Sequence, residues 1–202
     1  MKHQTGVKSE KHREDWETPI AIIEACQEHF NAGKPFDVDL CASKDNKRFE
    51  RWFGLDSPED NVCVALTKWA HTWTTGWCNP PFSIEFMELL TSYILEWQQR
   101  YDHKVNRGIF LVLPATKSDQ QWWHDLVFQP GLVFGIIHIR GRVYYELNGE
   151  RKWGADHPTQ IMILMQESQA WMLEGIRHYS MERVPLDDPD KKGWTYRITK
   201  EC

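Results

Sequence analysis

Hydrophobic side chains recur along the chain with two different periods, and each period predicts one kind of element. A helical spacing is found at Ile22, Ile23, Cys26 and Phe30. Thr18 can cap this helix, Pro19 suits its first turn, and Asn31-Ala32-Gly33 ends it. The pattern therefore predicts an amphipathic helix close to the N-terminus.

Two more helices are predicted further along the chain. The second begins after Ser83, which can cap it, and the apolar side chains on its one face are Phe86, Leu90, Tyr93 and Trp97. A shorter one surrounds Trp122, Trp123 and Leu126. Both follow predicted strands, so they indicate an alternation of strands and helices.

Strands are predicted where apolar residues alternate with polar ones or form short continuous runs. The predicted segments are 36–41, 76–78, 109–113, 133–139, 160–165 and 194–198. Residues 143–153 indicate a hairpin, because Asn148-Gly149 is a preferred pair for a tight turn. Residues 185–193 indicate a loop. The order of elements predicts an α/β fold, with a mostly parallel sheet and an antiparallel edge hairpin.

Composition adds limits to this picture. A length of 202 residues suits a single domain at 16–202, preceded by a charged, aperiodic tail at 1–15. No apolar run has the length of a membrane span, and the polar N-terminus has no signal-peptide core. Five cysteines without a C-x-x-C pair favour a reducing cytoplasm over a disulfide framework. The net charge of -5 counts against indiscriminate nucleic-acid binding but leaves DNA as a substrate open, because a local basic face would suffice.

The tetrapeptide Asn79-Pro80-Pro81-Phe82 lies between a predicted strand and a helix start, where open α/β sheets bind ligands. Successive prolines restrict the backbone, so the segment is a rigid bracket. An adenine amino group is a weak nucleophile, because its lone pair is delocalised into the ring. The Asn79 side-chain oxygen and the Pro80 carbonyl could grip its two hydrogens. Phe82 could stack on a base flipped out of the duplex.

Several blocks around the tetrapeptide occur in an order that resembles the phage-type DNA N6-adenine methyltransferase (Dam) family. The blocks are Trp16-Glu17-Thr18-Pro19, Phe36-Asp37-Val38-Asp39-Leu40-Cys41-Ala42-Ser43, Trp77-Cys78-Asn79-Pro80-Pro81-Phe82-Ser83, Leu111-Val112-Leu113-Pro114-Ala115-Thr116, Trp122-Trp123-His124 and Arg140-Gly141-Arg142-Val143-Tyr144. They cover most of residues 15–165. The resemblance implies a Rossmann-like S-adenosylmethionine-dependent methyltransferase fold and an adenine-specific DNA methyltransferase. If phage-encoded, such an enzyme acts in the bacterial host cytoplasm.

The resemblance also implies a cofactor site. Thr18 and Pro19 would lie at the helix start that holds the methionine end of S-adenosylmethionine, since a helix N-terminus suits a carboxylate. Asp39 would accept from the cofactor's ammonium group, with Cys41, Ala42 and Ser43 around it. No G-x-G-x-x-G loop follows the first predicted strand. The acid for the ribose hydroxyls is left open among Asp56, Glu59 and Asp60, with Asp56 as our choice.

Asp37 and Asp39 point to one face of a strand and could instead form a metal pair. No histidine stands nearby at ligand spacing, and methyl transfer from a sulfonium requires no metal. We therefore favour cofactor binding by Asp39 and expect no metal. Cys41 and Cys78 lie near strand ends without a clear histidine partner, so packing is the better interpretation than nucleophilic catalysis.

DNA contacts are predicted on two segments. Arg140, Arg142, Arg151 and Lys152 surround the predicted hairpin, with Tyr144, Tyr145 and Trp153 between them. A solvated hairpin paired with Glu146 and Glu150 explains the same charges equally well. Lys117 and Trp122 follow the strand 109–113 and could border the DNA cleft, although core packing is the commoner role of tryptophan.

The resulting hypothesis is direct methyl transfer to the N6 amino group of adenine in DNA. The leading alternative is another conjugated nitrogen, in RNA adenine or protein glutamine, which could use the same bracket. A non-catalytic DNA-binding relative is a third possibility, and the intact Asn79 and Asp39 argue against it.

Overall fold

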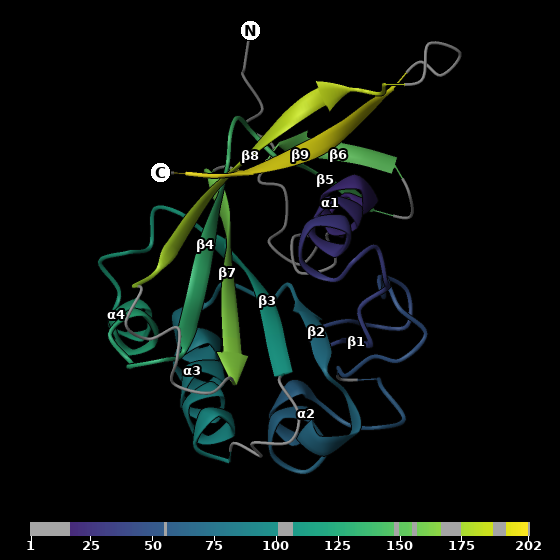
Figure 1. Cartoon of the computed structure of the whole chain (residues 1–202). Helices are drawn as coiled ribbons and strands as arrows, with labels where there is room; N and C mark the ends of the chain where they lie inside the picture. Colours follow the sequence, from purple (N-terminus) through teal and green to yellow (C-terminus); the bar gives the residue numbers. More distant parts are fainter. Residues whose placement is uncertain are drawn as a thin grey trace, which may run out of the picture.

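The protein is built around a seven-stranded mixed sheet with helices on both faces (Figure 1). The computed structural model describes residues 17–54, 56–100, 107–147, 150–154, 157–166, 175–187 and 193–201. The predicted tail at 1–15 and the Asn148-Gly149 turn lie outside these residues. Among the helices that the structure describes, none has the length and apolar character that a membrane span needs.

The helices and strands have the following bounds. The helices are α1 (Ile20–Phe30), α2 (Val62–Thr67), the 3-10 helix η2 (Ala70–Thr72), α3 (Ile84–Gln99) and α4 (Gln121–Val127). The strands are β1 (Val38–Asp39), β2 (Thr75–Cys78), β3 (Arg107–Pro114), β4 (Val133–Ile139), β5 (Tyr144–Leu147), β6 (Glu150–Gly154), β7 (Thr159–Gln166), β8 (Arg177–Pro185) and β9 (Trp194–Lys200).

The order of strands across the large sheet is β1-β2-β3-β7-β4-β8-β9. Strands β1, β2, β3, β4 and β8 run in one direction, whereas β7 and β9 run against them. The predicted α/β architecture is therefore confirmed, in a mixed sheet in which most strands share one direction. The carboxyl ends of β1, β2, β3 and β4 all lie at one edge, where such sheets bind ligands.

Alternation along β3 divides the core into two layers. Ile109, Leu111 and Leu113 pack on one face against α2, α3 and α4. Phe110 and Val112 pack on the other face, which α1 covers. Because this strand is buried on both faces, its sequence is a continuous apolar run and not an alternating one.

The predicted helix starts have different outcomes. Ser83 caps α3 as expected, since its hydroxyl accepts a hydrogen bond from the Phe86 backbone N–H at 3.3 Å. Thr18 does not cap α1, so that prediction is wrong. The N-cap of α1 is Pro19, and no side chain caps this end. The residues that predicted the end of α1 do end it, because Ala32 and Gly33 both adopt positive φ angles.

Strand β1 is shorter than predicted because its outer neighbour is a loop segment. The Asp39 backbone N–H donates to the Arg51 carbonyl at 3.0 Å, and the Phe53 N–H donates to the Asp39 carbonyl at 2.8 Å. The chain after Asp39 then turns away, and Ala42 pairs with Phe53 through a further backbone bond of 3.0 Å. The segment at 51–53 thus protects the edge of the sheet beside the end of β1.

The antiparallel hairpins differ from the prediction in their placement. Strands β5 and β6 pair with each other in a separate two-stranded sheet, and Glu17 joins it through a bridge to Glu146. The antiparallel edge of the large sheet is instead the β8–β9 hairpin. Neither β8 nor α2 was expected from the sequence. Both hairpins lie at the upper end of Figure 1, near α1.

Gly54 permits a close approach of two backbones beside the end of β1. A Cβ atom here would lie 1.7 Å from the carbonyl oxygen of Ala42. We expect Gly54→Ala to lower the free energy of unfolding by about 1–3 kcal/mol, the usual cost of overpacking. Urea denaturation measures this. Gly108→Ala is the control, because its nearest contact is 3.6 Å and its effect should stay below about 1 kcal/mol. Equal losses in the two variants would contradict the proposed clash.

Candidate active site

The candidate site lies at the edge where four parallel strands end. Segments 39–43, 79–82, 115–117 and 140–143 follow β1, β2, β3 and β4 directly, so all of them emerge at this edge. Asp39 and Trp77 are partners in the register of β1 with β2. Because neighbouring strands lie about 5 Å apart, the first residues after β1 and β2 are near neighbours.

The tetrapeptide after β2 is a bracket between strand and helix. Asn79 is half-buried, with its Oδ1 atom shielded from solvent, and Pro80 is buried. Phe82 is 41% exposed, immediately before the capped start of α3. An amide with a buried oxygen therefore lies beside an aromatic ring that remains open to solvent.

Asp39 is a buried carboxylate at the end of the neighbouring strand. Its side chain is only 3% exposed, and its Oδ2 accepts a hydrogen bond from the Arg48 backbone N–H at 3.1 Å. Burial raises the pKa of Asp39 to about 6, although backbone hydrogen bonds from Arg48 and Cys41 and the positive charge of Arg48 oppose the rise. A cationic ligand group would relieve this burial cost, because it favours the charged carboxylate.

Arg48 holds the surroundings of Asp39 together. Its guanidinium donates to the Thr18 carbonyl at 2.8 Å and pairs with Glu17 at 3.0 Å and Glu146 at 2.7 Å. These partners come from the segment before α1 and from β5. The sequence analysis did not identify Arg48, because no local pattern marks an ion pair between residues that are 98 positions apart.

The start of α1 fits the carboxylate end of an amino-acid cofactor. Thr18 Oγ1 is buried and meets no hydrogen-bond partner within the part of the chain that the structure describes. No side chain caps the first turn of α1, and its Ile22 N–H donates to the Pro19 carbonyl at 3.0 Å. A helix N-terminus of this kind suits an anion. Since Arg48 binds both the Thr18 carbonyl and Asp39, the start of α1 and the end of β1 are brought together.

The segment after β1 is folded by local hydrogen bonds. Ala42 is buried, and the Ser43 backbone N–H donates to Asn46 Oδ1 at 2.6 Å. Among the three acids considered for the ribose, Glu59 is engaged by Arg51 at 2.6 Å. Asp56 accepts from the Lys44 backbone N–H at 3.0 Å. Asp60 lines a pocket of about 400 Å³ together with Gly54, Ser57, Pro58 and Asn61.

Two thiols lie at the centre of this edge. The Cys41 and Cys78 sulfur atoms are 3.6 Å apart. The hydrogen bond with Cys78 and burial raise the pKa of the Cys41 thiol well above its ordinary value, so this thiol stays protonated. A protonated, packed thiol is a poor nucleophile, which agrees with the packing role expected for both cysteines.

Asp37 has a structural role beside the site. Its carboxylate accepts hydrogen bonds from the backbone N–H groups of Thr74 and Thr75 and from the Thr74 hydroxyl, at 2.6–2.9 Å. Burial acts to raise its pKa, but these hydrogen bonds outweigh it and lower the pKa. Within the described residues, no group of three or more His, Cys, Asp or Glu side chains is placed to hold a metal ion.

The residues predicted to contact DNA are not all on the surface. Arg140, Arg142 and Arg151 are exposed, and Lys117 is half-buried in the turn after β3. The side chain of Lys152 lies outside the described part of the chain. Trp122 lies on α4, is 3% exposed and packs in the core. Core packing, the alternative role considered for it, therefore replaces its prediction as a DNA contact.

The raised pKa of Asp39 makes stability depend on pH in a defined direction. The folded protein binds this proton more tightly than the unfolded chain, whose aspartate pKa is about 3.9. Asp39 therefore lowers the free energy of unfolding as pH rises through about 4 to 6, by a total of about 3 kcal/mol. We expect Asp39→Asn to flatten this part of the pH profile, measured by urea denaturation. Parallel profiles for the two proteins would contradict the assignment.

The network of Arg48 should contribute much more to stability than an exposed ion pair does. We expect Arg48→Gln to lower the free energy of unfolding by about 3 kcal/mol, because it removes a partner of the buried Glu17 carboxylate. Arg100→Gln is the control, since Arg100 pairs with Glu96 on the surface of α3, and its effect should remain below about 1 kcal/mol. Thermal or urea unfolding of both variants measures the difference. If Arg48→Gln lowers the free energy of unfolding no more than Arg100→Gln does, this interpretation is wrong.

Comparison with known proteins identifies the family. The family model for DNA N-6-adenine-methyltransferase (Dam) matches residues 5–194. A search of curated proteins finds none that matches this chain. The match extends from the tail before α1 to the first residue of β9, and so includes every strand end at the candidate site. The chain therefore belongs to the DNA N-6-adenine-methyltransferase (Dam) family.

Proposed function

We propose that the protein transfers a methyl group from S-adenosylmethionine to the N6 amino group of adenine in DNA. One observation carries the proposal. The amide bracket at Asn79 follows β2 directly, and the buried carboxylate of Asp39 ends the neighbouring parallel strand β1. A group that holds an acceptor nitrogen thus lies beside a group suited to a cationic donor, at the ligand-binding edge of the sheet.

The bracket acts by positioning. Asn79 Oδ1 and the Pro80 carbonyl oxygen accept hydrogen bonds from the two hydrogens of the amino group. Their grip favours the pyramidal nitrogen whose lone pair can attack. S-adenosylmethionine, when bound, would supply a sulfonium methyl group for transfer to this nitrogen. The proton then lost from the nitrogen passes to water. Pro81 keeps the bracket extended, and Phe82, which is exposed, stacks on the flipped base.

The chain's own residues hold the donor at three points. Asp39 accepts from the ammonium group, and the start of α1 with Thr18 and Pro19 binds the carboxylate. Cys41, Ala42 and Ser43 line the pocket between these points and the ribose. The charged pair of Glu59 with Arg51 favours Asp56 and Asp60 as the acids that accept from the ribose hydroxyls.

Basic side chains around the same edge would bind the DNA backbone. Lys117 follows β3, and the exposed arginines Arg140 and Arg142 follow β4. Arg151 and Lys152 belong to β6, which is part of the hairpin that β4 leads into. With a net charge of -5, attraction to phosphate has to come from such local groups and not from the whole protein.

The test is an incubation with S-adenosylmethionine that carries a labelled methyl group, in separate arms with unmethylated duplex DNA, RNA and protein. We expect label in N6-methyladenine released from the DNA. Asn79→Ala should reduce the rate by about 100-fold or more, the usual effect of removing an oriented acceptor or donor in a reaction centre. Asn31→Ala is the matched control, because Asn31 bonds the Lys34 and Pro35 carbonyls after α1, and its rate should be unchanged.

Each other outcome selects a different function. Label confined to RNA or to protein glutamine would favour another conjugated nitrogen as the acceptor. Binding of the cofactor without transfer to any arm, or no cofactor binding at all, would favour a non-catalytic DNA-binding relative. In both cases the proposed function is wrong.

A further inference from the structure

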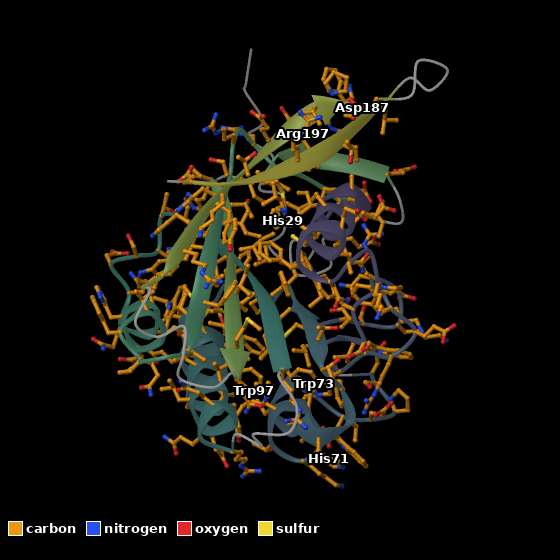
Figure 2. All side chains as sticks on the ribbon, in the orientation of Figure 1. His29, His71, Trp73, Trp97, Asp187 and Arg197 are labelled. Carbon is orange, nitrogen blue, oxygen red and sulfur yellow. The ribbon has the colours of Figure 1, made fainter. Side chains whose placement is uncertain are left out.

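The β8–β9 hairpin extends beyond the sheet at the edge of the candidate site. The last pairing of β4 with β8 joins Ile139 to Met181, and residues 182–185 pair only with 194–197 of β9. We call these two stretches the overhang. Because β8 runs parallel to β4, the overhang projects past the carboxyl end of the strands. Figure 2 shows Arg197 and Asp187 at this end, with Trp73 and Trp97 at the opposite end.

On the outer face of the overhang, carboxylates neutralise the positive charge of arginine. In an antiparallel pair, directly opposed residues point to the same face. Glu182 therefore shares a face with Arg197. Arg197 pairs with Asp187 at 3.7 Å, and Glu182 lies 4.0 Å from Arg140. Arg197, the arginine of this face within the described residues, therefore has an acidic partner.

On the inner face of the overhang, an arginine side chain lies against an aromatic ring. Met181 and Ile198 pack here in the core layer under α1, so the next residues on this face, Arg183 and Tyr196, continue it beyond the core. The Arg183 guanidinium lies 4.8 Å from the centre of the Trp194 ring. Trp194 is 54% exposed, which is unusual for the largest side chain.

A second pair of this kind lies on the neighbouring hairpin. The Arg151 guanidinium of β6 is 3.8 Å from the centre of the Tyr144 ring of β5, which is 40% exposed. Tyr196 is half-buried on the inner face of the overhang. Burial raises the pKa of its hydroxyl, and the positive charges of Arg183 and Arg151 oppose the rise. The overhang and the β5–β6 hairpin both lie at the upper end of the molecule in Figure 1.

A guanidinium stacked on an aromatic ring is prepared to bind phosphate. Its flat face is covered by the ring, while its N–H groups point outward in the plane and match two phosphate oxygens. Stacking also restricts the side chain, which reduces the entropy lost on binding. A carboxylate partner would instead compete with phosphate for the same N–H groups, as Asp187 does for those of Arg197.

We propose that Arg183, supported by Trp194, binds the phosphodiester backbone of duplex DNA next to the target base, at the end of the molecule that also carries Arg151 and Tyr144. The inference rests on the proposed function, because it takes DNA as the substrate. It extends the DNA contacts to β8 and β9, which lie far in sequence from the catalytic loop. The surface contacts backbone and not base edges, so it contributes affinity without sequence preference.

The test measures the affinity of the full-length protein for a fluorescent DNA duplex by anisotropy over a series of salt concentrations. We expect Arg183→Gln to weaken binding by about fivefold at low salt and to reduce the salt slope by about one. Trp194→Ala should weaken binding about threefold, since the ring only orients the guanidinium. Arg183→Lys keeps the charge without the planar fork, and its affinity should lie between those of the wild type and Arg183→Gln.

Arg197→Gln is the matched control, because it makes the same change of charge on the same hairpin but on the outer face. Its affinity should stay within about twofold of the wild type. Equal weakening by Arg183→Gln and Arg197→Gln would show a general charge effect and overturn the inference, as would an unchanged affinity of Trp194→Ala. If methyl groups are transferred to DNA but the two arginine variants bind DNA equally well, the proposed function stands and this inference fails. A specific loss for Arg183→Gln without any methyl transfer would retain only the DNA surface.

Discussion

The ion-pair network of Arg48 is the contact on which the candidate site depends. One side chain joins the carbonyl before α1, a carboxylate of the same segment and a carboxylate of β5, while its backbone N–H binds Asp39. None of these segments would be held at the end of β1 by the pairing of the large sheet alone. Because the Glu17 and Asp39 side chains are buried, their charges make the contact obligatory: a buried carboxylate without a partner is costly.

The same network explains why a short strand can present a buried acid. Two sheet pairings and the loop segment at 51–53 fix the backbone of Asp39, and Gly54 lets the following segment approach closely. The carboxylate is thereby held out of water before any ligand arrives, which raises its pKa to about 6. Part of the free-energy cost of removing this carboxylate from water is therefore met during folding and not when a cation binds. A site of this kind binds its ligand better when the pH lies above that pKa.

The parts of this structure that could be predicted from sequence are those fixed by burial. The run 133–139 became β4 with those bounds, and α3 has its expected cap and apolar face, because a single local period determines each. Strand β8 was missed, since Arg177 and Arg183 flank Tyr179 and Met181 on the same face and leave only two apolar residues in alternation. Trp122 was predicted to contact DNA but is buried in the core, because composition does not tell which tryptophan is buried. Arg48 could not be found, because its role depends on segments that only the folded chain brings together.

Under the proposed function, a chain with an acidic net charge has to bind DNA through local groups. Its two hairpins are continuous with the large sheet: β5 and β6 lie between β4 and β7 in the sequence, and β8 extends alongside β4. The position of β8 relative to Asn79 is therefore fixed by strand register, whereas β5 and β6 form a separate sheet that a bridge joins to Glu17. The Arg183 and Arg151 guanidinium groups lie against aromatic rings, so under the proposed function the local charge stays positive where phosphate would bind. The overall negative charge would then oppose non-specific binding elsewhere on the surface.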